Sequence, residues 1–342
     1  MDQTVKNEKK RHHFIPITYL NNFTDNSGKV FAYRKDEPEQ HLHITPDAIG
    51  FTKYYYSQPL PQGGRDNNTF EDFFGTIESK WNGLTARMCS GADGISYWSG
   101  DDFQDLFTFL GLMRVRVPAA RDMVEVMLAE HDKATTRLLD QQGKLPPKPL
   151  GAEDILDHLS VAIDPHMSLR AMGQLAIGFG VVLDHVGFEV LHNKTSVSFL
   201  TSDNPVVCFD PSVPEGSVLP YQVRPPRGSI ELLFPINPDT MLRGHSALRR
   251  PGPPRLGHTK LTDRGEAKRI NRFLARFGYR FVFARDRTHE SLIVKYASTS
   301  PVMKMISKPK STSEPIMHCV FGPRPIKPKW TTDDVPREVG AE

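Results

Sequence analysis

The sequence contains little cysteine, and its three cysteines are not paired by their spacing. Cys89, Cys208 and Cys319 lie far apart, and no CxxC motif occurs. Structural zinc sites and disulfide frameworks both need regularly spaced cysteines, so we expect neither. Scattered cysteines are typical of proteins in a reducing compartment, and we therefore expect a cytoplasmic protein.

Long apolar segments are also absent. The longest run, residues 175–183, is about half the length of a membrane span and is bounded by Gln174 and Asp184. The charged N-terminus is not followed by an apolar core, so we expect no signal peptide. We interpret the run as a buried helix and expect no membrane partner.

The loop sequences of several common enzyme classes are missing. The chain has no GxxxxGK[ST], no GxGxxG after a strand, no HExxH and no GxSxG. Because these loops carry the chemistry, their absence argues against an ATPase, a dinucleotide-dependent enzyme, a zincin protease and an α/β-hydrolase.

Charge of one sign is not in large excess. The 342 residues carry a net charge of +3 and are 38% hydrophobic, which is enough for one large domain or two smaller ones. A nearly neutral chain gives no general reason to expect nucleic acid as a partner. Residues 6–11 are locally basic, and we expect residues 1–10 to form a mobile, solvated arm, although a basic run beside a site can contact phosphate.

Periodicity and capping signals predict an alternation of helices and strands. Thr69 and Ser99 each stand three residues before an acid, which predicts two capping boxes. The expected helices are 16–23, 45–50 (one turn), 69–84, 99–117, 121–142, 153–163, 166–184 and 263–277. The expected strands are 29–34, 53–57, 187–192, 196–200, 206–209, 230–235, 240–244 and 280–284, with 187–192 and 196–200 paired around Asn193 and Lys194.

This order of elements predicts an α+β protein with a single large domain over residues 11–300. A helical layer, about residues 60–185, would cover a mixed or antiparallel sheet built from N-terminal and later segments. The proline-rich stretch 143–151 is a candidate sub-boundary. Residues 301–342 are rich in proline, lysine and charge, and we expect a poorly packed tail.

A series of short motifs occurs in one order along the chain. They are His12–Pro16, Tyr19-Leu20, Asn22-Phe23, Gly28–Phe31, Tyr55-Tyr56, Glu78, Arg116–Arg121, Thr201–Val206, Phe234–Pro238 and Asn271. With these motifs the chain resembles the large bacterial family known as domain of unknown function 4238, over most of residues 11–285. The resemblance implies an α+β domain and no particular activity.

A second resemblance concerns only the first motif. His12-His13-Phe14-Ile15-Pro16 is similar to the first strand of HNH endonucleases, which implies that His12 is a metal ligand and His13 the general base. Asp47 would be the remaining ligand, and the metal would be a divalent ion such as Mg²⁺ or Mn²⁺ that polarises a phosphate of nucleic acid or of another phosphate-bearing ligand. The alternative is structural: the two histidines are bonded to backbone carbonyls where the arm meets the core.

Other polar motifs have two interpretations each. Asp203 follows a strand and could present its carboxylate to a metal, or form an Asx-turn in its own loop. Arg116 and Arg121 flank Pro118 and could bind an anion, or form an internal salt bridge to Glu78 or Asp203.

We therefore consider a hypothesis in which these side chains converge on one pocket. Its members are His12, His13, Glu78, Arg116, Arg121 and Asp203, with Asn22 and Asn204 as further polar candidates. Two functions remain open: a metal-dependent phosphodiesterase or nuclease, and a non-catalytic binding protein with a structural His/Arg/Asp cluster or an anion-binding pocket. The oligomeric state is left open.

Overall fold

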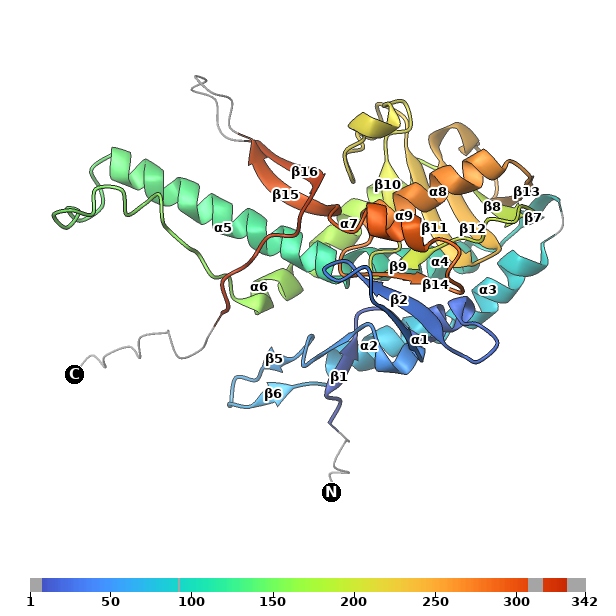
Figure 1. The fold of residues 1–342 in the computed structure, drawn as a ribbon, viewed down its shortest axis with the longest axis horizontal. Coiled ribbons are helices and arrows are strands. Elements are labelled where there is room, and N and C mark those ends of the chain that lie inside the picture. Colours follow the sequence, from blue (N-terminus) through green and yellow to red (C-terminus); the bar gives the residue numbers. More distant parts are fainter. Residues whose placement is uncertain (1–7, 92, 307–315, 331–342) are drawn as a thin grey trace.

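A computed structural model describes residues 8–91, 93–306 and 316–330 of the chain. Its centre is a six-stranded sheet, which lies beside a four-stranded sheet (Figure 1). In spatial order the larger sheet consists of β10 (Val207–Phe209), β11 (Glu231–Asn237), β12 (Thr240–His245), β8 (Gly187–Asn193), β13 (Arg255–Leu261) and β7 (Gly94–Tyr97). Only β8 and β13 run parallel, so the sheet is mixed.

The second sheet joins the two ends of the domain. Its order is β3 (His41–Ile44), β2 (Val30–Arg34), β14 (Phe281–Ala284) and β9 (Thr201–Ser202), and every pairing is antiparallel. The N-terminal strand β2 therefore lies directly against β14, which follows almost 250 residues later. The expectation that N-terminal and later segments build one sheet is confirmed for this sheet.

Helices cover both faces of the six-stranded sheet. The α-helices of the described residues are α1 (Ile17–Leu20), α2 (Thr69–Glu78), α3 (Trp81–Ser90), α4 (Gly100–Val115), α5 (Pro118–Gln141), α6 (Pro165–Arg170), α7 (Met172–Leu183), α8 (Arg264–Phe277) and α9 (Glu290–Lys295). Alternation along β11 turns Phe234 toward Trp81 and Phe109 on α3 and α4, whereas Leu233 belongs to the cluster that contains Phe273 of α8. The predicted α+β class, with a helical layer on a sheet, is thus confirmed.

Local signals explain several helix ends. Ser99 forms the predicted capping box with Asp102, whose backbone N–H donates to the serine hydroxyl over 3.1 Å. At Thr69 the prediction is wrong, because Asp66 instead accepts from the N–H groups of Asn68 and Thr69. Helix 69–84 is divided into α2 and α3, and residues 153–163 form turns rather than a helix.

Two predicted strands are wrong. Residues 54–57 form a turn after β4 (Phe51–Lys53), in which Tyr54 has a φ of +57°. Residues 196–200 join no sheet, because the N–H of Leu200 donates to the Asn271 side chain (3.0 Å) and that of Phe199 to the carbonyl of Pro238 (2.7 Å). Strand β8 pairs with β12 and β13 instead.

Part of the segment expected as a tail has regular structure. Strands β15 (Ser300–Ile306) and β16 (Ile316–Gly322) pair with each other and lie over α5, which extends from the body of the molecule (Figure 1). Residues 1–7 of the expected arm, and 331–342 of the tail, lie outside the described residues. No helix in the described part of the chain is long and apolar enough to cross a membrane.

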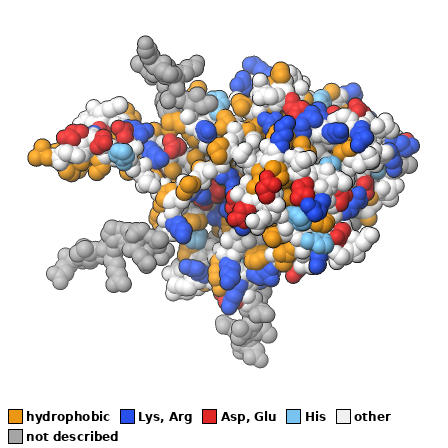
Figure 2. All heavy atoms as spheres, in the orientation of Figure 1, with side chains coloured by type: hydrophobic (Ala, Val, Ile, Leu, Met, Phe, Trp, Pro, Cys, Tyr) orange, Lys and Arg blue, Asp and Glu red, His pale blue; other side chains and the backbone are white. Residues whose placement is uncertain are grey.

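The surface carries charges of both signs. Over the coloured part of the face in Figure 2, basic and acidic side chains are interspersed, and no continuous basic stripe crosses it. This agrees with the nearly neutral composition and offers no nucleic-acid track on that face.

Candidate functional site

His12 is a buried structural histidine. It lies in β1 (Arg11–His13), which pairs with β4, and its side chain is fully buried. Nδ1 accepts a hydrogen bond from the N–H of Tyr56 (2.8 Å), so Nε2 carries the proton and donates to the carbonyl of Lys9 (3.0 Å). Burial lowers the pKa of this imidazole and keeps it neutral. A metal could bind at Nδ1 only if the Tyr56 bond were lost.

His13 is more open. Its Nε2 lies 3.2 Å from the carbonyl oxygen of Asp47, and its ring lies against Phe51 with the ring centroids 5.4 Å apart. Burial lowers the pKa of His13, and the nearby Glu78 carboxylate partly opposes that shift. Nδ1 has no hydrogen-bond partner among the described residues.

Arg116 joins the first motif to the helices. Only 1% of it is exposed, and its guanidinium forms an ion pair with Glu78 and donates to the backbone carbonyl of His13. The Tyr56 hydroxyl in turn donates to the carbonyl of Arg116 (3.0 Å). Neighbouring Glu78 and Tyr56 raise the pKa of Arg116, so it stays charged. The predicted internal salt bridge to Glu78 is therefore present.

Arg121 is also used within the protein. Its three nitrogens donate to the carbonyls of Tyr55 (2.5 Å) and Pro165 (2.7 Å) and to the hydroxyl of Ser168 (3.0 Å). These bonds fix the turn after β4 and the start of α6 to α5.

The side chain of Asp203 forms hydrogen bonds with the backbone of a segment distant in the sequence, and not with its own loop. Its two carboxylate oxygens accept from the N–H groups of Tyr279 and Arg280, each over 2.8 Å. An Asx-turn in its own loop would need an N–H at Pro205, which has none, so that alternative is wrong. Burial raises the pKa of Asp203, and the three backbone N–H groups near it oppose the shift.

The remaining candidates are dispersed. The Asn204 side-chain amide donates to the Tyr221 hydroxyl (2.6 Å) and the Phe277 carbonyl (2.8 Å). The Asp47 carboxylate is exposed, whereas the amide nitrogen of Asn22 is buried without a partner in the described part of the chain.

The structure thus brings together only part of the expected pocket. His13, Glu78 and Arg116 are in contact, and His12 reaches them through Tyr56. Asp203 forms no hydrogen bond or ion pair with this group in the described part of the chain. Within the described ranges, no three His, Cys, Asp or Glu side chains gather closely enough to hold a metal ion.

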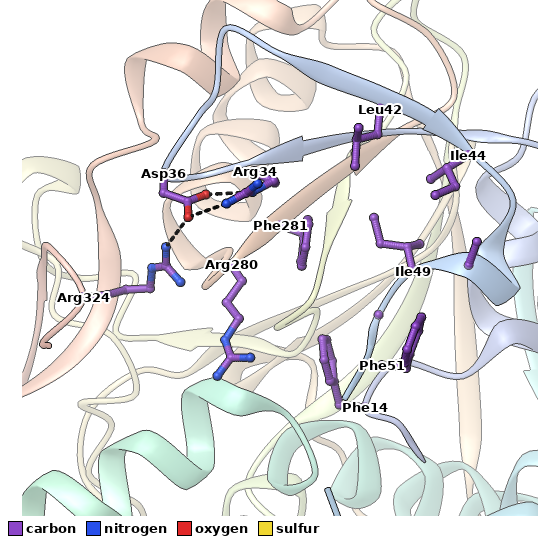
Figure 3. A pocket seen from close by; sticks show the side chains of 12 residues that line it. Phe14, Arg34, Asp36, Leu42, Ile44, Ile49, Phe51, Arg280, Phe281 and Arg324 are labelled. Atoms are coloured by element: carbon purple, nitrogen blue, oxygen red, sulfur yellow. Dashed lines mark hydrogen bonds and ion pairs between the residues drawn. The ribbon is translucent and has the colours of Figure 1, made fainter. Parts of the chain in front are cut away.

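A cavity beside the first motif was not expected from the sequence. It has a volume of about 410 Å³ and lies between β2, β3, the start of β4 and the start of β14 (Figure 3). Its charged lining residues are Arg34, Asp36, Arg280 and Arg324, and its larger apolar ones are Phe14, Leu42, Ile44, Ile49, Phe51 and Phe281. Their positions in the sequence are too far apart to suggest a common site.

Only some of the charged side chains that line this cavity form ion pairs with one another. Asp36 accepts from Nε and Nη2 of Arg34 (3.1 and 2.9 Å) and lies 3.9 Å from Arg324. Arg280 has no side-chain hydrogen bond or ion pair with any described residue, and Figure 3 shows its guanidinium on the side away from Arg34 and Leu42. Three guanidinium groups against one carboxylate leave a net charge of +2.

A buried hydroxyl near Arg280 also lacks a partner. The hydroxyl of Tyr55 is buried without a hydrogen bond among the residues that the structure describes. Burial raises the pKa of Tyr55, and the positive charges of Arg121 and, to a lesser extent, of Arg280 oppose the shift.

Comparison with known proteins gives one match. A family model described as "Protein of unknown function (DUF4238)" matches residues 11–288. No curated protein and no solved structure matches the chain.

Proposed function

The chain belongs to this DUF4238 family of unknown function, and we propose that it is a binding protein for a small anionic ligand, held in the cavity beside the first motif. The ligand would carry a phosphate or a carboxylate, since these groups match the geometry of a guanidinium. In this proposal the site recognises the ligand, and no bond of the ligand is broken.

One observation carries the proposal. Arg280 is partly buried and lines a cavity, and its guanidinium has no hydrogen bond or ion pair with a described residue, although its charge acts on the buried carboxylate of Asp203. A partly buried cation is costly unless it is paired. An anion in the cavity would supply the missing partner, and Arg324 lies on the same side (Figure 3).

In this proposal the motif residues shape the cavity and do not themselves contact the bound anion. His12 and Arg116 fix β1 and its exit, so that Phe14, whose N–H donates to the carbonyl of Gly50 (2.9 Å), forms one wall. Asp203 accepts from the backbone N–H of Arg280 and thereby fixes the start of β14. The polar motifs would thus be required for the shape of the site.

The experiment is calorimetric titration of the full chain with inorganic phosphate, phenyl phosphate and phenylacetate. We expect at least one of these anions to bind, and Arg280→Gln to weaken it about tenfold to a hundredfold, the value of a charge-assisted hydrogen bond. The matched control is Arg170→Gln, since Arg170 is exposed on α6 and outside the cavity. Absence of binding, or equal binding by the Arg280 variant, contradicts the proposal.

A metal-dependent nuclease is the second candidate, because His13, Glu78 and Arg116 lie together. It would use His13 as base and a divalent metal held by groups that include His12, Asp47 or Asp203. Our proposal predicts no cleavage of DNA or RNA with Mg²⁺ or Mn²⁺. Cleavage that stops with EDTA and is lost in His13→Ala would favour the nuclease instead.

A further inference from the structure

We propose that the ligand is an amphipathic organic anion, a phosphate monoester or carboxylate carried on an aromatic or branched aliphatic group, and that Asp36 competes with its head group. This inference rests on the proposed anion-binding function and adds the chemical class of the ligand and a residue that sets its affinity.

The lining of the cavity is divided into a charged part and an apolar part. Figure 3 shows the charged side chains Arg34, Asp36 and Arg324 on one side, and Leu42, Ile44, Ile49 and Phe51 on the other. Arg280 and Phe281 are neighbours in sequence and lie between the two ends. A ligand that occupies the whole cavity therefore needs a charged end and an apolar end.

The size of the cavity also fits an organic ligand. A volume of about 410 Å³ falls in the range of pockets for small organic ligands and is far larger than an inorganic phosphate ion needs. An inorganic phosphate ion would contact the arginines, but the apolar side chains on the other side of the cavity would remain in contact with water. Covering those side chains with an aromatic ring should tighten binding about tenfold to a hundredfold.

Leu42 is an exposed apolar side chain in the lining of the cavity. Its side chain is 42% exposed although it lines the cavity beside the better buried Ile44 and Ile49. Large apolar side chains at the mouth of a pocket become buried when an apolar ligand group binds. Leu42 can also be replaced with little effect on folding, because it is already exposed.

Asp36 lies where it competes with the ligand's head group for the arginines of the cavity. The guanidinium of Arg34 holds the pKa of Asp36 below its usual range, so the carboxylate is ionised at neutral pH. It occupies the donors of Arg34 and lies 3.9 Å from Arg324. An incoming anion would therefore be attracted by Arg280 and Arg324 and repelled by Asp36. Removing that negative charge should increase affinity for every anion that binds there.

The test compares three anions by calorimetric titration of the full chain. We expect phenyl phosphate or phenylacetate to bind at least about tenfold more tightly than inorganic phosphate, and the two organic probes separate a phosphate from a carboxylate head. Asp36→Asn should tighten binding about threefold to tenfold. Glu37→Gln is its control, because Glu37 pairs with Arg34 at 3.2 Å but does not line the cavity.

A second pair of variants tests the apolar end. Leu42→Ser should weaken phenyl phosphate about threefold to tenfold and leave inorganic phosphate unchanged, whereas Leu138→Ser, at an exposed leucine of α5, should change neither. If all three anions bind equally and still depend on Arg280, the ligand class is wrong but the binding function stands. If Asp36→Asn weakens binding, the competitor role is wrong. If no anion binds, both proposals fail.

Discussion

At the scale of single residues, groups that are chemically suited to catalysis are mostly occupied with the backbone. His12, Arg116, Arg121 and Asp203 together bond the backbone at Lys9, His13, Tyr55, Tyr56, Pro165, Tyr279 and Arg280. The sequence singled out these residues through their motifs and through the chemistry of their side chains. It could not separate a structural from a chemical role, since that depends on which partner each atom meets.

Arg116 gives the first prediction. Replacing it with methionine should lower the free energy of unfolding by about 3 to 5 kcal/mol, because Glu78 and the carbonyl of His13 lose their buried partner. Urea denaturation of Arg116→Met and of the exposed control Arg170→Met measures the difference. Equal midpoints for the two variants would show that the Arg116 contacts contribute nothing.

Glu71 gives a prediction about pH. Burial raises the pKa of this carboxyl to about 7, and nearby Glu78 adds to the shift. One oxygen is buried without a partner in the described part of the chain. The folded state therefore binds more protons than the unfolded state between the ordinary pKa of 4.5 and about 7. The stability that depends on this proton is full below pH 4.5 and is lost as the pH rises through 7.

The corresponding variant is Glu71→Gln, which stays neutral. We expect it to raise the free energy of unfolding by about 1 to 2 kcal/mol at pH 8, since Glu71 is partly exposed and the full shift must be discounted. At pH 5 the gain should be much smaller. A gain that is the same at both pH values would mean that the titration of Glu71 is not its cause.

At the scale of elements, the alternation of polar and apolar residues and the capping signals correctly predicted some helices and strands. These are the elements whose backbone hydrogen bonds join residues close together in the sequence. The β11–β12 hairpin, α4 with its Ser99 cap and α8 after Asp263 are examples. The failures have long-range causes. Tyr54 adopts a positive φ in a turn where Tyr56 bonds His12, and residues 196–200 bond the side chain of Asn271 instead of a strand. No local sequence pattern indicates such hydrogen-bond partners, because they lie far away in the sequence.

Lys35 gives a prediction at this scale, because it joins three elements. Its ammonium follows β2 and donates to the carbonyls of Ala275 (3.0 Å) and Gly278 (2.8 Å), at the end of α8, and of Thr299, before β15. Burial lowers its pKa to about 7, but three carbonyl acceptors require all three N–H groups, so we take the bound form as charged.

Lys35→Met should therefore leave three carbonyls without their donor and destabilise the protein by about 2 to 4 kcal/mol. The loss should be local as well. Hydrogen exchange should become faster in residues 300–303 of β15 before it does in β11 or β12. Unchanged protection of β15 would contradict the assigned role of Lys35.

At the scale of the whole molecule, the cavity draws its walls from segments that are far apart in the chain. Phe14, residues 34–51, Arg280 and Arg324 meet only because β2 pairs with β14 and because residues 323–330 return to that end of the sheet. The sequence predicted the class of the fold, and it marked Phe14 through its motif. The three arginines carry no local signal, since each is an ordinary charged residue of a strand end or loop.

Arg324 gives the prediction for this scale. It comes from the segment after β16, which is also bound to α5 through Lys327 and its ion pairs with Asp122 and Glu125. Arg324→Gln should weaken anion binding about threefold to tenfold and change the free energy of unfolding by less than about 0.5 kcal/mol, because its pair with Asp36 is long and partly exposed. Calorimetry and urea denaturation measure the two effects. A loss of stability without loss of affinity would assign Arg324 to folding alone.

The most direct test is a crystal structure of the full chain grown with phenyl phosphate. The account predicts the phosphate between the guanidinium groups of Arg280 and Arg324, with the ring against Phe281 and the apolar wall. A phosphate bound elsewhere, or an empty cavity in protein that calorimetry shows to be saturated, would contradict it.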